Sequence, residues 1–412
     1  MVVLCLGMDR GLMMATKKDL TKAYAAEYGK ATKKEKGRML DELCASTGWS
    51  RVNARRAIRL ASRRKGPASA VKRKPRARKY SYDALVVLIE AWGLVGEPCG
   101  KYFAAVMEDQ LERLVRFNEL VKVAKRVTPE VLAELVSMSP ATIDRYLAPT
   151  KKARYPEAKS TTTPDGLLRS SIPLRTAMDG FPDEPGYLEI DTVAHCGHST
   201  KGDYLVTINA TDPYLGWTVM RTVKNKAFVH MKAGMDWIVR QVPWPIKGID
   251  FDNGSEFLNW GIIAWCEKKK IPIITRSRVD EKNDNAHIEQ RNGDWVRKHA
   301  FRYRYEDDDE MELLNRLWPL VMDRKNHLLP CVKAVGWDER PSGRSRRKYD
   351  KPRTPYQRAV DAKALPKGQK ADKLAERRHK LNPADITRRI NRIQLALIDR
   401  SRPRNRTHRR AS

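Results

Sequence analysis

The pattern of apolar residues changes at Gly186, and this change constrains the fold more than any other feature of the 412-residue chain. Before it, apolar residues recur at helical spacing; after it, β-rich runs come first and then alternate with helical stretches. The sequence predicts strands at 187–194, 204–210, 217–223, 246–251 and 271–275, and helices at 227–242, 258–269 and 283–301. This order predicts an α/β domain with a mixed five-stranded sheet and helices packed on it.

The region before the sheet contains two helix-turn-helix patterns. In the first, a helix at 33–43 is followed by a turn that contains Gly48 and by a second helix with Ser50 as its N-cap. Three arginines stand early in that second helix, where we expect them to contact DNA: Arg51, Arg55 and Arg56. An ordinary helical hairpin is the alternative interpretation.

The second pattern is a helix at 129–136, a short turn, and a helix that Ser139 caps and Pro140 begins. We expect Thr142 and Arg145 to face DNA from this helix. The alternative for Arg145 is an ion pair on the protein surface with a neighbouring acid, Asp144 or Glu134.

The charge of the chain indicates a polyanionic partner. It has 81 Lys and Arg against 50 Asp and Glu, which gives a formal net charge of +31. Aromatic residues are only 8%, and we find no basic amphipathic helix with a Trp or Phe face, so nucleic acid is favoured over a membrane surface. No apolar run approaches the roughly 20 residues that cross a bilayer, so no membrane span is expected.

A basic segment at 61–80 separates the two helical patterns. It carries nine Lys and Arg and no acid, and its Pro and Gly residues disfavour packing. We interpret it as a linker in which Lys72, Arg73 and Lys74 follow DNA phosphates; a solvated spacer is the alternative. The six cysteines are scattered and form no C-x-x-C pair, which indicates a reducing, cytoplasmic environment.

Three acids stand out by their position in the predicted elements. Asp191 lies inside the first strand in L-E-I-D-T-V, Asp252 ends the fourth in D-N-G-S-E-F, and Glu289 begins the last helix in N-D-N-A-H-I-E-Q-R-N. Oxygen ligands suit Mg²⁺ or Mn²⁺, and two such ions about 3.5–4 Å apart assist in-line displacement at a phosphodiester. Each acid alone is better explained as a surface or capping residue, so the inference rests on all three in this order.

Residues 186–301 resemble the catalytic core of the D-D-E transposases of bacterial insertion sequences and of retroviral-type integrases. The resemblance rests on the three acid-containing motifs and on the gap of 36 residues between the second and third acids. It implies a ribonuclease H-like fold, and it implies that Asp191, Asp252 and Glu289 are the catalytic residues and bind two Mg²⁺ (or Mn²⁺) ions per active site.

The resemblance also implies contacts to DNA beside the acids. The loop after the second acid matches at Asn253, Gly254 and Glu256, and residues around the third acid match at Asn283, Asn285, His287 and Arg291. The implied reaction has two steps: hydrolysis of a phosphodiester at the end of a mobile element, then attack of the freed 3′-hydroxyl on target DNA.

The sequence therefore predicts a DNA transposase that binds element ends and target duplex DNA, as a homo-oligomer because two ends must be joined. A helix-turn-helix regulator with a decayed nuclease-like domain is the alternative. A plain ribonuclease H-like nuclease is disfavoured by the two DNA-reading patterns. A zinc site at His195-Cys196-Gly197-His198 is disfavoured because no further ligands follow at zinc-site spacing.

The predicted domain order follows from these assignments. It comprises a helix-turn-helix domain at 1–60, a basic linker at 61–80, a second helical domain at 81–150, a linker at 151–185, a catalytic domain at 186–335 and a basic, mostly helical C-terminal region at 336–412.

Overall fold

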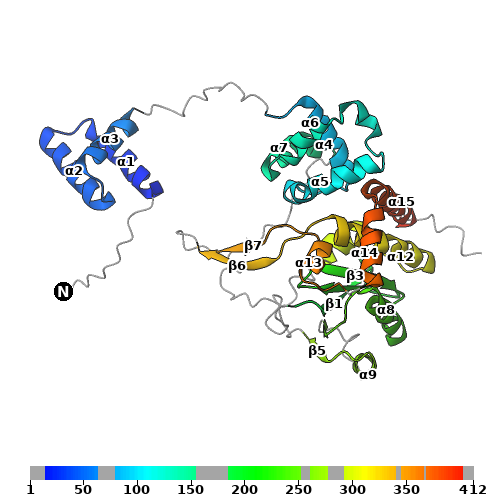
Figure 1. Ribbon diagram of the computed structural model, residues 1–412. Helices are drawn as coiled ribbons and strands as arrows, with labels where there is room; N and C mark the ends of the chain where they lie inside the picture. The colour runs from blue at the N-terminus through cyan, green and yellow to red at the C-terminus, as the bar shows by residue number, and fades with distance from the viewer. Residues whose placement is uncertain are drawn as a thin grey trace, which may run out of the picture. The chain divides into compact units, whose positions relative to one another are not determined.

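The computed structural model describes residues 14–63, 79–154, 184–251, 260–276, 292–339, 345–365 and 368–401. The chain divides into two compact units, Met1–Ala77 and Arg78–Ser412, which are coloured blue and cyan-to-red in Figure 1. Within the described ranges, every helix is too short or too polar to span a lipid bilayer.

The first unit consists of three helices around a small apolar core. They are α1 (Met14–Tyr28), α2 (Lys33–Thr47) and α3 (Arg51–Ser62). Leu40 and Leu43 pack against Ala54 and Ile58, and all four are buried. The turn between α2 and α3 begins at Gly48, whose positive φ of 69° suits a residue without a Cβ. Ser50 caps α3 through Asn53 N, so the predicted N-cap is confirmed.

The second unit begins with a helical bundle. Its members are α4 (Tyr82–Leu94), α5 (Gly100–Arg116), the 3₁₀ turn η1 (Val121–Arg126), α6 (Pro129–Val136) and α7 (Pro140–Arg154). Trp92, Phe103 and Leu114 are buried at its centre with Ile143 and Leu147 of α7. The hydroxyl of Ser139 accepts a hydrogen bond from Thr142 N at 3.4 Å, as expected of an N-cap.

A five-stranded mixed sheet follows, in the order β3-β2-β1-β4-β5. The strands are β1 (Tyr187–Ala194), β2 (Val206–Asp212), β3 (Trp217–Val223), β4 (Gly248–Phe251) and β5 (Ile273–Arg276). β1, β2 and β3 pair antiparallel, whereas β4 runs parallel to β1 and to β5. The sheet is therefore mixed, with an antiparallel half and a parallel half.

The two faces of the sheet carry different side chains. On one face Ile208 and Val219 pack against α8 (Phe228–Gln241), whose Met235 and Ile238 are fully buried. On the other face lie Met220 and a row of buried polar residues, covered by α12 (Asp308–Met322). The polar row consists of Thr207, Asn209, Thr211, Thr218 and Thr222. α9 (Trp260–Lys268) connects β4 to β5.

The chain ends in further helices and a hairpin. After the π-helical segment η2 (Asn292–Arg297) come α11 (Lys298–Ala300), α12, a second π-helical segment η3 (Asp323–Leu328), the strand pair β6 (Ala334–Glu339) and β7 (Ser345–Tyr349), α13 (Pro355–Asp361), α14 (Gln369–Lys380) and α15 (Pro383–Ser401). Figure 1 shows α15 lying beside both α12 and the bundle of α4 and α5.

Helix α15 belongs to two cores at once. Its Ala384 is buried in the core of the helical bundle, whereas Ile390 and Leu397 are buried with Trp318 of α12. Arg113 of α5 adds a contact to α14, because it donates to the carbonyl of Arg378 at 2.8 Å. We call this region, where the bundle and α12 meet the C-terminal helices, the seam. The bundle, the sheet and the C-terminal helices therefore belong to one compact unit.

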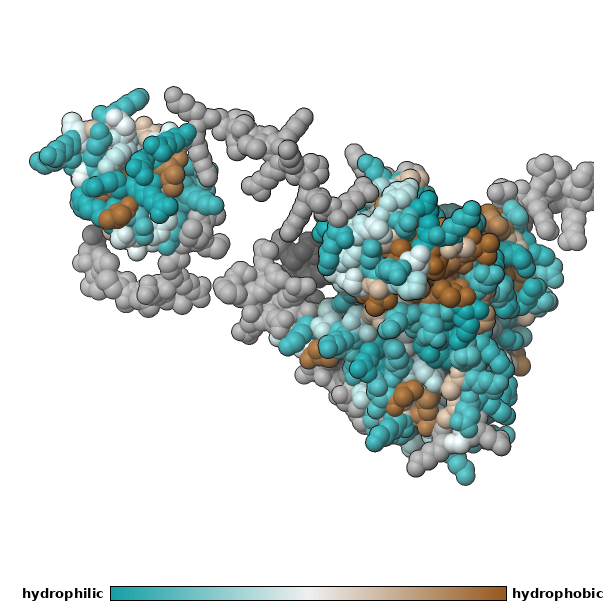
Figure 2. All heavy atoms as spheres, turned by 45° about the horizontal axis from the view of Figure 1, so that its top comes forward, coloured by the Kyte–Doolittle hydropathy of each residue, from teal (hydrophilic) through white to brown (hydrophobic). Residues whose placement is uncertain are grey.

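Most of the surface visible in Figure 2 is hydrophilic on both units, with separate hydrophobic patches. This agrees with a chain in which 32% of the residues are charged.

We predict that Leu397→Ala destabilises the protein by about 2–5 kcal/mol, because it removes a fully buried side chain from the seam. The matched control is Leu395→Ala on the same helix, whose side chain is 62% exposed and whose loss should change the free energy of unfolding by less than about 0.5 kcal/mol. Urea unfolding followed by tryptophan fluorescence measures both. Equal effects of the two substitutions would show that α15 does not hold the unit together.

Candidate active site

Asp191 is held in a defined orientation on the central strand. It lies half-buried on β1, where it is directly opposite Asn209 of β2. One of its carboxylate oxygens accepts a hydrogen bond from Thr192 N at 2.6 Å, and the other accepts one from Asn292 Nδ2. These two hydrogen bonds fix the orientation of the carboxylate on the strand.

Asn292 connects three elements through its amide. Its Oδ1 accepts a hydrogen bond from Asn209 Nδ2 at 2.7 Å, while its Nδ2 donates to Asp191. Both asparagines are buried, with exposed fractions of 0% and 5%. The relay Asn209–Asn292–Asp191 therefore fixes the start of η2 against β1 and β2, because a buried amide left without partners is costly.

Neighbouring side chains extend this network along the polar face of the sheet. The hydroxyls of Thr211 and Thr218 lie 2.9 Å apart, and those of Thr207 and Thr222 lie 2.8 Å apart. Trp318 Nε1 of α12 donates to Thr222 at 2.7 Å. Cross-strand pairs of this kind satisfy the polar groups without water, so the carboxylate of Asp191 stands at the edge of a rigid surface.

The other two predicted catalytic acids, Asp252 and Glu289, lie outside the described residues. So do Lys72, Arg73, Lys74, Asn253, Asn283, Asn285, His287 and Arg291. The roles of all of these residues stay predictions. The part of the chain that the structure describes contains no cluster of three His, Cys, Asp or Glu side chains that could hold a metal ion.

The arginines predicted to contact DNA differ in their surroundings. Arg55 and Arg56 are exposed on α3, whereas Arg51 forms an ion pair with Asp41 and donates to the carbonyl of Gly37 at 3.3 Å. Arg51 therefore helps to pack α3 against α2, although its side chain is 48% exposed, and Arg59 of the same helix is exposed as well.

Arg145 is exposed on α7, and neither suggested partner is available to it. Asp144 accepts from Gly100 N at 3.0 Å and pairs with Lys151 at 2.8 Å, and Glu134 accepts from Ser81 N at 2.7 Å. Thr142 is half-buried, and its hydroxyl lies 2.9 Å from that of Ser139. Among the described residues, Arg145 forms no ion pair.

The segment His195-Cys196-Gly197-His198, considered above as a zinc site, is held by hydrogen bonds within the protein. His195 is 3% exposed, and its Nε2 lies 2.7 Å from the hydroxyl of Thr207; burial lowers the pKa of its imidazole to about 4. The following loop is held by the guanidinium of Arg304, which donates to the carbonyls of Ser199 and Asp203 at 2.8 and 2.7 Å. A neutral core histidine and an arginine-organised loop account for this segment.

Comparison with known proteins gives the following. No family model matches the chain. Over 326 residues it is 30% identical to an uncharacterized protein, y4rM, of Sinorhizobium fredii, and the match covers 79% of this chain and 90% of that protein. The chain belongs to the same family as y4rM. Among solved structures, it resembles the catalytic core domain of BIV integrase with 14% identity and a TM-score of 0.29, over 43% of this chain and 95% of that one.

Asn209 and Asn292 were missed in the sequence. The signal for Asn209 is the alternation in V-T-I-N-A-T-D, where Thr207, Asn209 and Thr211 share one face of a strand flanked by apolar residues. Such a buried polar face requires partners, and this requirement points to asparagine and threonine residues elsewhere in the core. Asn292 ends the motif N-D-N-A-H-I-E-Q-R-N around the third acid, but its contacts could not be read from that motif, because its partners lie on two other elements.

We predict that Asn209 and Asn292 are energetically coupled. Asn209→Ala and Asn292→Ala should each cost about 1–3 kcal/mol, because each leaves a buried amide unpaired. The double variant should cost less than the sum, by about 0.5–3 kcal/mol, since the second change removes the group that the first had left unpaired.

Urea unfolding of the four proteins gives the coupling energy. The control cycle combines Asn209→Ala with Asn382→Ala, a residue that hydrogen-bonds to Glu119 and Ala384 and shares no partner with Asn209. That cycle should be additive within about 0.5 kcal/mol. Additivity in both cycles would contradict the relay.

Proposed function

We propose that this protein is a DNA transposase that binds the ends of a mobile element and catalyses strand cleavage and strand transfer. The observation that carries the proposal is the hydrogen bond from Asn292 to Asp191. Asn292 is three residues after Glu289, so three residues of chain, at most about 11 Å between Cα atoms, separate Glu289 from a residue that contacts Asp191.

The strand register supports the same arrangement for the second acid. Phe251, the last residue of β4, pairs in parallel register with Ile190, and Asp252 is the next residue after Phe251. Parallel neighbours present their carboxyl ends at the same edge of a sheet. The three acids are thus linked by short stretches of chain to one edge, which is what a shared metal site requires.

The donor set suits Mg²⁺ or Mn²⁺. Asp191, Asp252 and Glu289 would hold two such ions with carboxylate oxygens only, which is the ligand chemistry these ions prefer. When bound, the ions would supply charge stabilisation to the attacking and leaving oxygens of an in-line displacement. Asn292 and Thr192 N would keep the Asp191 carboxylate oriented while substrate enters and leaves.

The reaction is hydrolysis followed by transesterification. Water attacks the phosphorus at the element end, and the 3′-oxygen leaves as a hydroxyl. That hydroxyl then attacks a phosphodiester of the target, so one bond forms and one breaks at each step. The exposed arginines of α3 and Arg145 of α7 would position the duplex, and a homo-oligomer would bring two ends together.

We predict that Asp191→Asn, Asp252→Asn and Glu289→Gln each lower Mg²⁺-dependent cleavage of element-end DNA by more than about 100-fold, the upper end of the effect of changing a residue that only supports a ligand. DNA binding should be unchanged, because none of these positions lies on α3 or α7. Asp308→Asn is the control, since that side chain is 74% exposed at the start of α12.

Cleavage and duplex binding are measured on the same preparations. Near-normal cleavage by any of the three variants would remove that residue from the metal site. Duplex binding by a native protein that cleaves no end in Mg²⁺ or Mn²⁺ would instead favour the helix-turn-helix regulator.

We predict that Arg55→Ala and Arg56→Ala weaken duplex binding by the full chain. Each lost phosphate contact should reduce the slope of log affinity against log salt by about 0.9. The control is Arg38→Ala on α2, an arginine of the same unit whose side chain is 76% exposed. If all three variants lose the same affinity, the effect is one of net charge, and α3 is not the recognition helix.

A further inference from the structure

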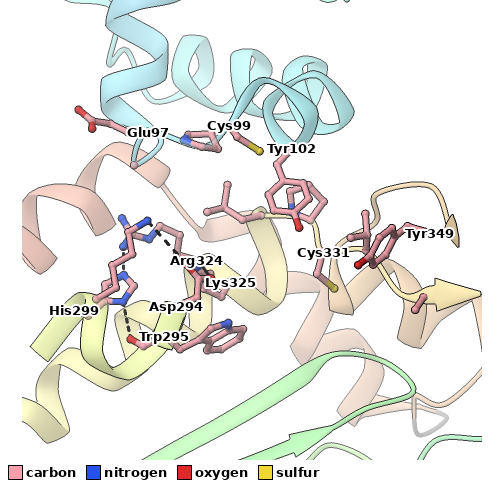
Figure 3. A pocket seen from close by; sticks show the side chains of 17 residues that line it. Glu97, Cys99, Tyr102, Asp294, Trp295, His299, Arg324, Lys325, Cys331 and Tyr349 are labelled. Carbon is pink, nitrogen blue, oxygen red and sulfur yellow. Dashed lines mark hydrogen bonds and ion pairs between the residues drawn. The ribbon is translucent and has the colours of Figure 1, made fainter. Parts of the chain in front are cut away.

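A cavity of about 400 Å³ lies between the helical bundle and the segment that follows the third predicted acid. One wall is the turn from α4 to α5, with Gly96 and Glu97; the other includes Lys298, Arg324 and Lys325 from α11 and η3. Figure 3 shows Arg324 and Lys325 on one side of the cavity and Cys99 and Tyr102 on the other. All of these residues belong to the second unit.

Arg324 places a buried positive charge in the wall. Its residue is only 7% exposed, and its Nη2 donates to Nε2 of His299 at 2.7 Å. His299 Nδ1 lies 2.7 Å from the carbonyl of Trp295, and burial together with Arg324 holds the pKa of His299 well below its usual range. The partner of the guanidinium is therefore a neutral ring. Among the described residues, Arg324 Nε has no hydrogen-bond partner.

The acids of the cavity are already engaged by other cations. Asp294 forms an ion pair with Lys325, and Glu97 forms one with Arg154 at 2.6 Å. Lys298 is 64% exposed and lies 4.0 Å from Asp294, a distance that leaves its ammonium open to another partner. Burial lowers the pKa of Arg324 to about 10, and the charge of Asp294 acts in the opposite direction. Asp294 is shared with Lys325 and Lys298, so three cations surround one carboxylate, and this wall favours an anionic ligand.

The backbone of the turn is shaped to admit Arg324. Gly96 has φ 89°, and a Cβ there would meet Arg324 Nη1 at 2.5 Å. The next residue, Glu97, adopts φ 59°, which is uncommon for a residue with a side chain. The positive φ of Gly96 ends α4, where Glu97 N donates to the carbonyl of Trp92 at 2.9 Å, and the missing Cβ leaves room for the guanidinium.

We propose that this cavity binds a phosphate group, either free or carried by DNA. Arg324 and Lys298 supply the cationic donors, and guanidinium groups match the geometry of phosphate oxygens. The volume is at the small end of the range for ligand sites, which suits one phosphate with part of the group that carries it. Binding of free phosphate does not depend on the proposed transposase activity, whereas occupancy by DNA does.

The first test is calorimetric titration of the full chain with inorganic phosphate, at ionic strength held constant with chloride. The wild-type protein should bind phosphate saturably at one site. Lys298→Ala should weaken that binding by about tenfold or more, as expected for one charge-assisted contact. The matched control is Lys224→Ala, whose lysine is 52% exposed and lies 3.8 Å from Asp308, outside the cavity.

A second variant tests the buried charge itself. Arg324→Gln should abolish phosphate binding, and circular dichroism will show whether the variant is folded. Failure of the wild-type protein to bind saturably, or equal phosphate affinities of Lys298→Ala and Lys224→Ala, would overturn the proposal.

A titration with duplex DNA distinguishes a phosphate carried by DNA from a free phosphate compound. If DNA occupies the cavity, the duplex competes with phosphate, and Lys298→Ala loses more DNA affinity than Lys224→Ala. If the ligand is a free phosphate compound, phosphate binds equally well in the presence of duplex, and the two variants bind DNA alike. Cleavage assays are independent of both readouts, so failure of the transposase proposal is distinguishable from failure of this one.

Discussion

The hydrogen bond from Asn292 to Asp191 joins two parts of the chain that are about one hundred residues apart. It closes the polar face of the sheet, because Asn292 also satisfies the buried amide of Asn209. The η2 segment then continues into Trp295 and Val296, which are buried under α12. Removing the contact would leave polar groups unpaired in a dry environment, where each costs on the order of 1–3 kcal/mol.

Helix α15 imposes the second constraint, because it completes two cores near the end of the chain. The bundle that carries α7 cannot bury its apolar surface fully without Ala384, and α12 cannot do so without Ile390 and Leu397. Contacts of such long sequence separation form late and cooperatively. A rigid seam between the bundle and the sheet follows, so a duplex held by α7 would have a fixed position relative to Asp191.

The fold was predictable where local pattern decides it. The strands β1 and β3 have the predicted bounds, and β2 and β5 begin two residues later than predicted, because neither Tyr204 nor Ile271 pairs in the sheet. The caps at Ser50 and Ser139 follow from residue type alone. The predicted sheet with helices was recognisable for the same reason: alternation and helical spacing are short-range signals.

Long-range contacts were not predictable in this way. Asn292 contacts Asn209 and Asp191, and Ala384 packs in a bundle that precedes it by more than 200 residues, so the residues next to either one do not show its partners. The same applies to the phosphate cavity, whose walls come from the α4–α5 turn and from η3. Residue type and spacing in the sequence show which residues are chemically suited to a site. The packing of the folded chain decides which of those residues lie next to each other.

The candidate active site and the proposed phosphate cavity share the segment η2, so a restraint on η2 at the cavity would act on the active site. η2 is a single π-helical turn whose first residue, Asn292, contacts Asp191, while Asp294 and Trp295 line the phosphate cavity. Segments of this kind are rare and are found mostly at functional sites. A phosphate bound between Arg324 and Lys298 would link η3 to α11, the helix that directly continues η2, and would thereby restrain η2. Because Asn292 is part of that turn, the restraint would reach the carboxylate of Asp191 directly, without movement of the sheet.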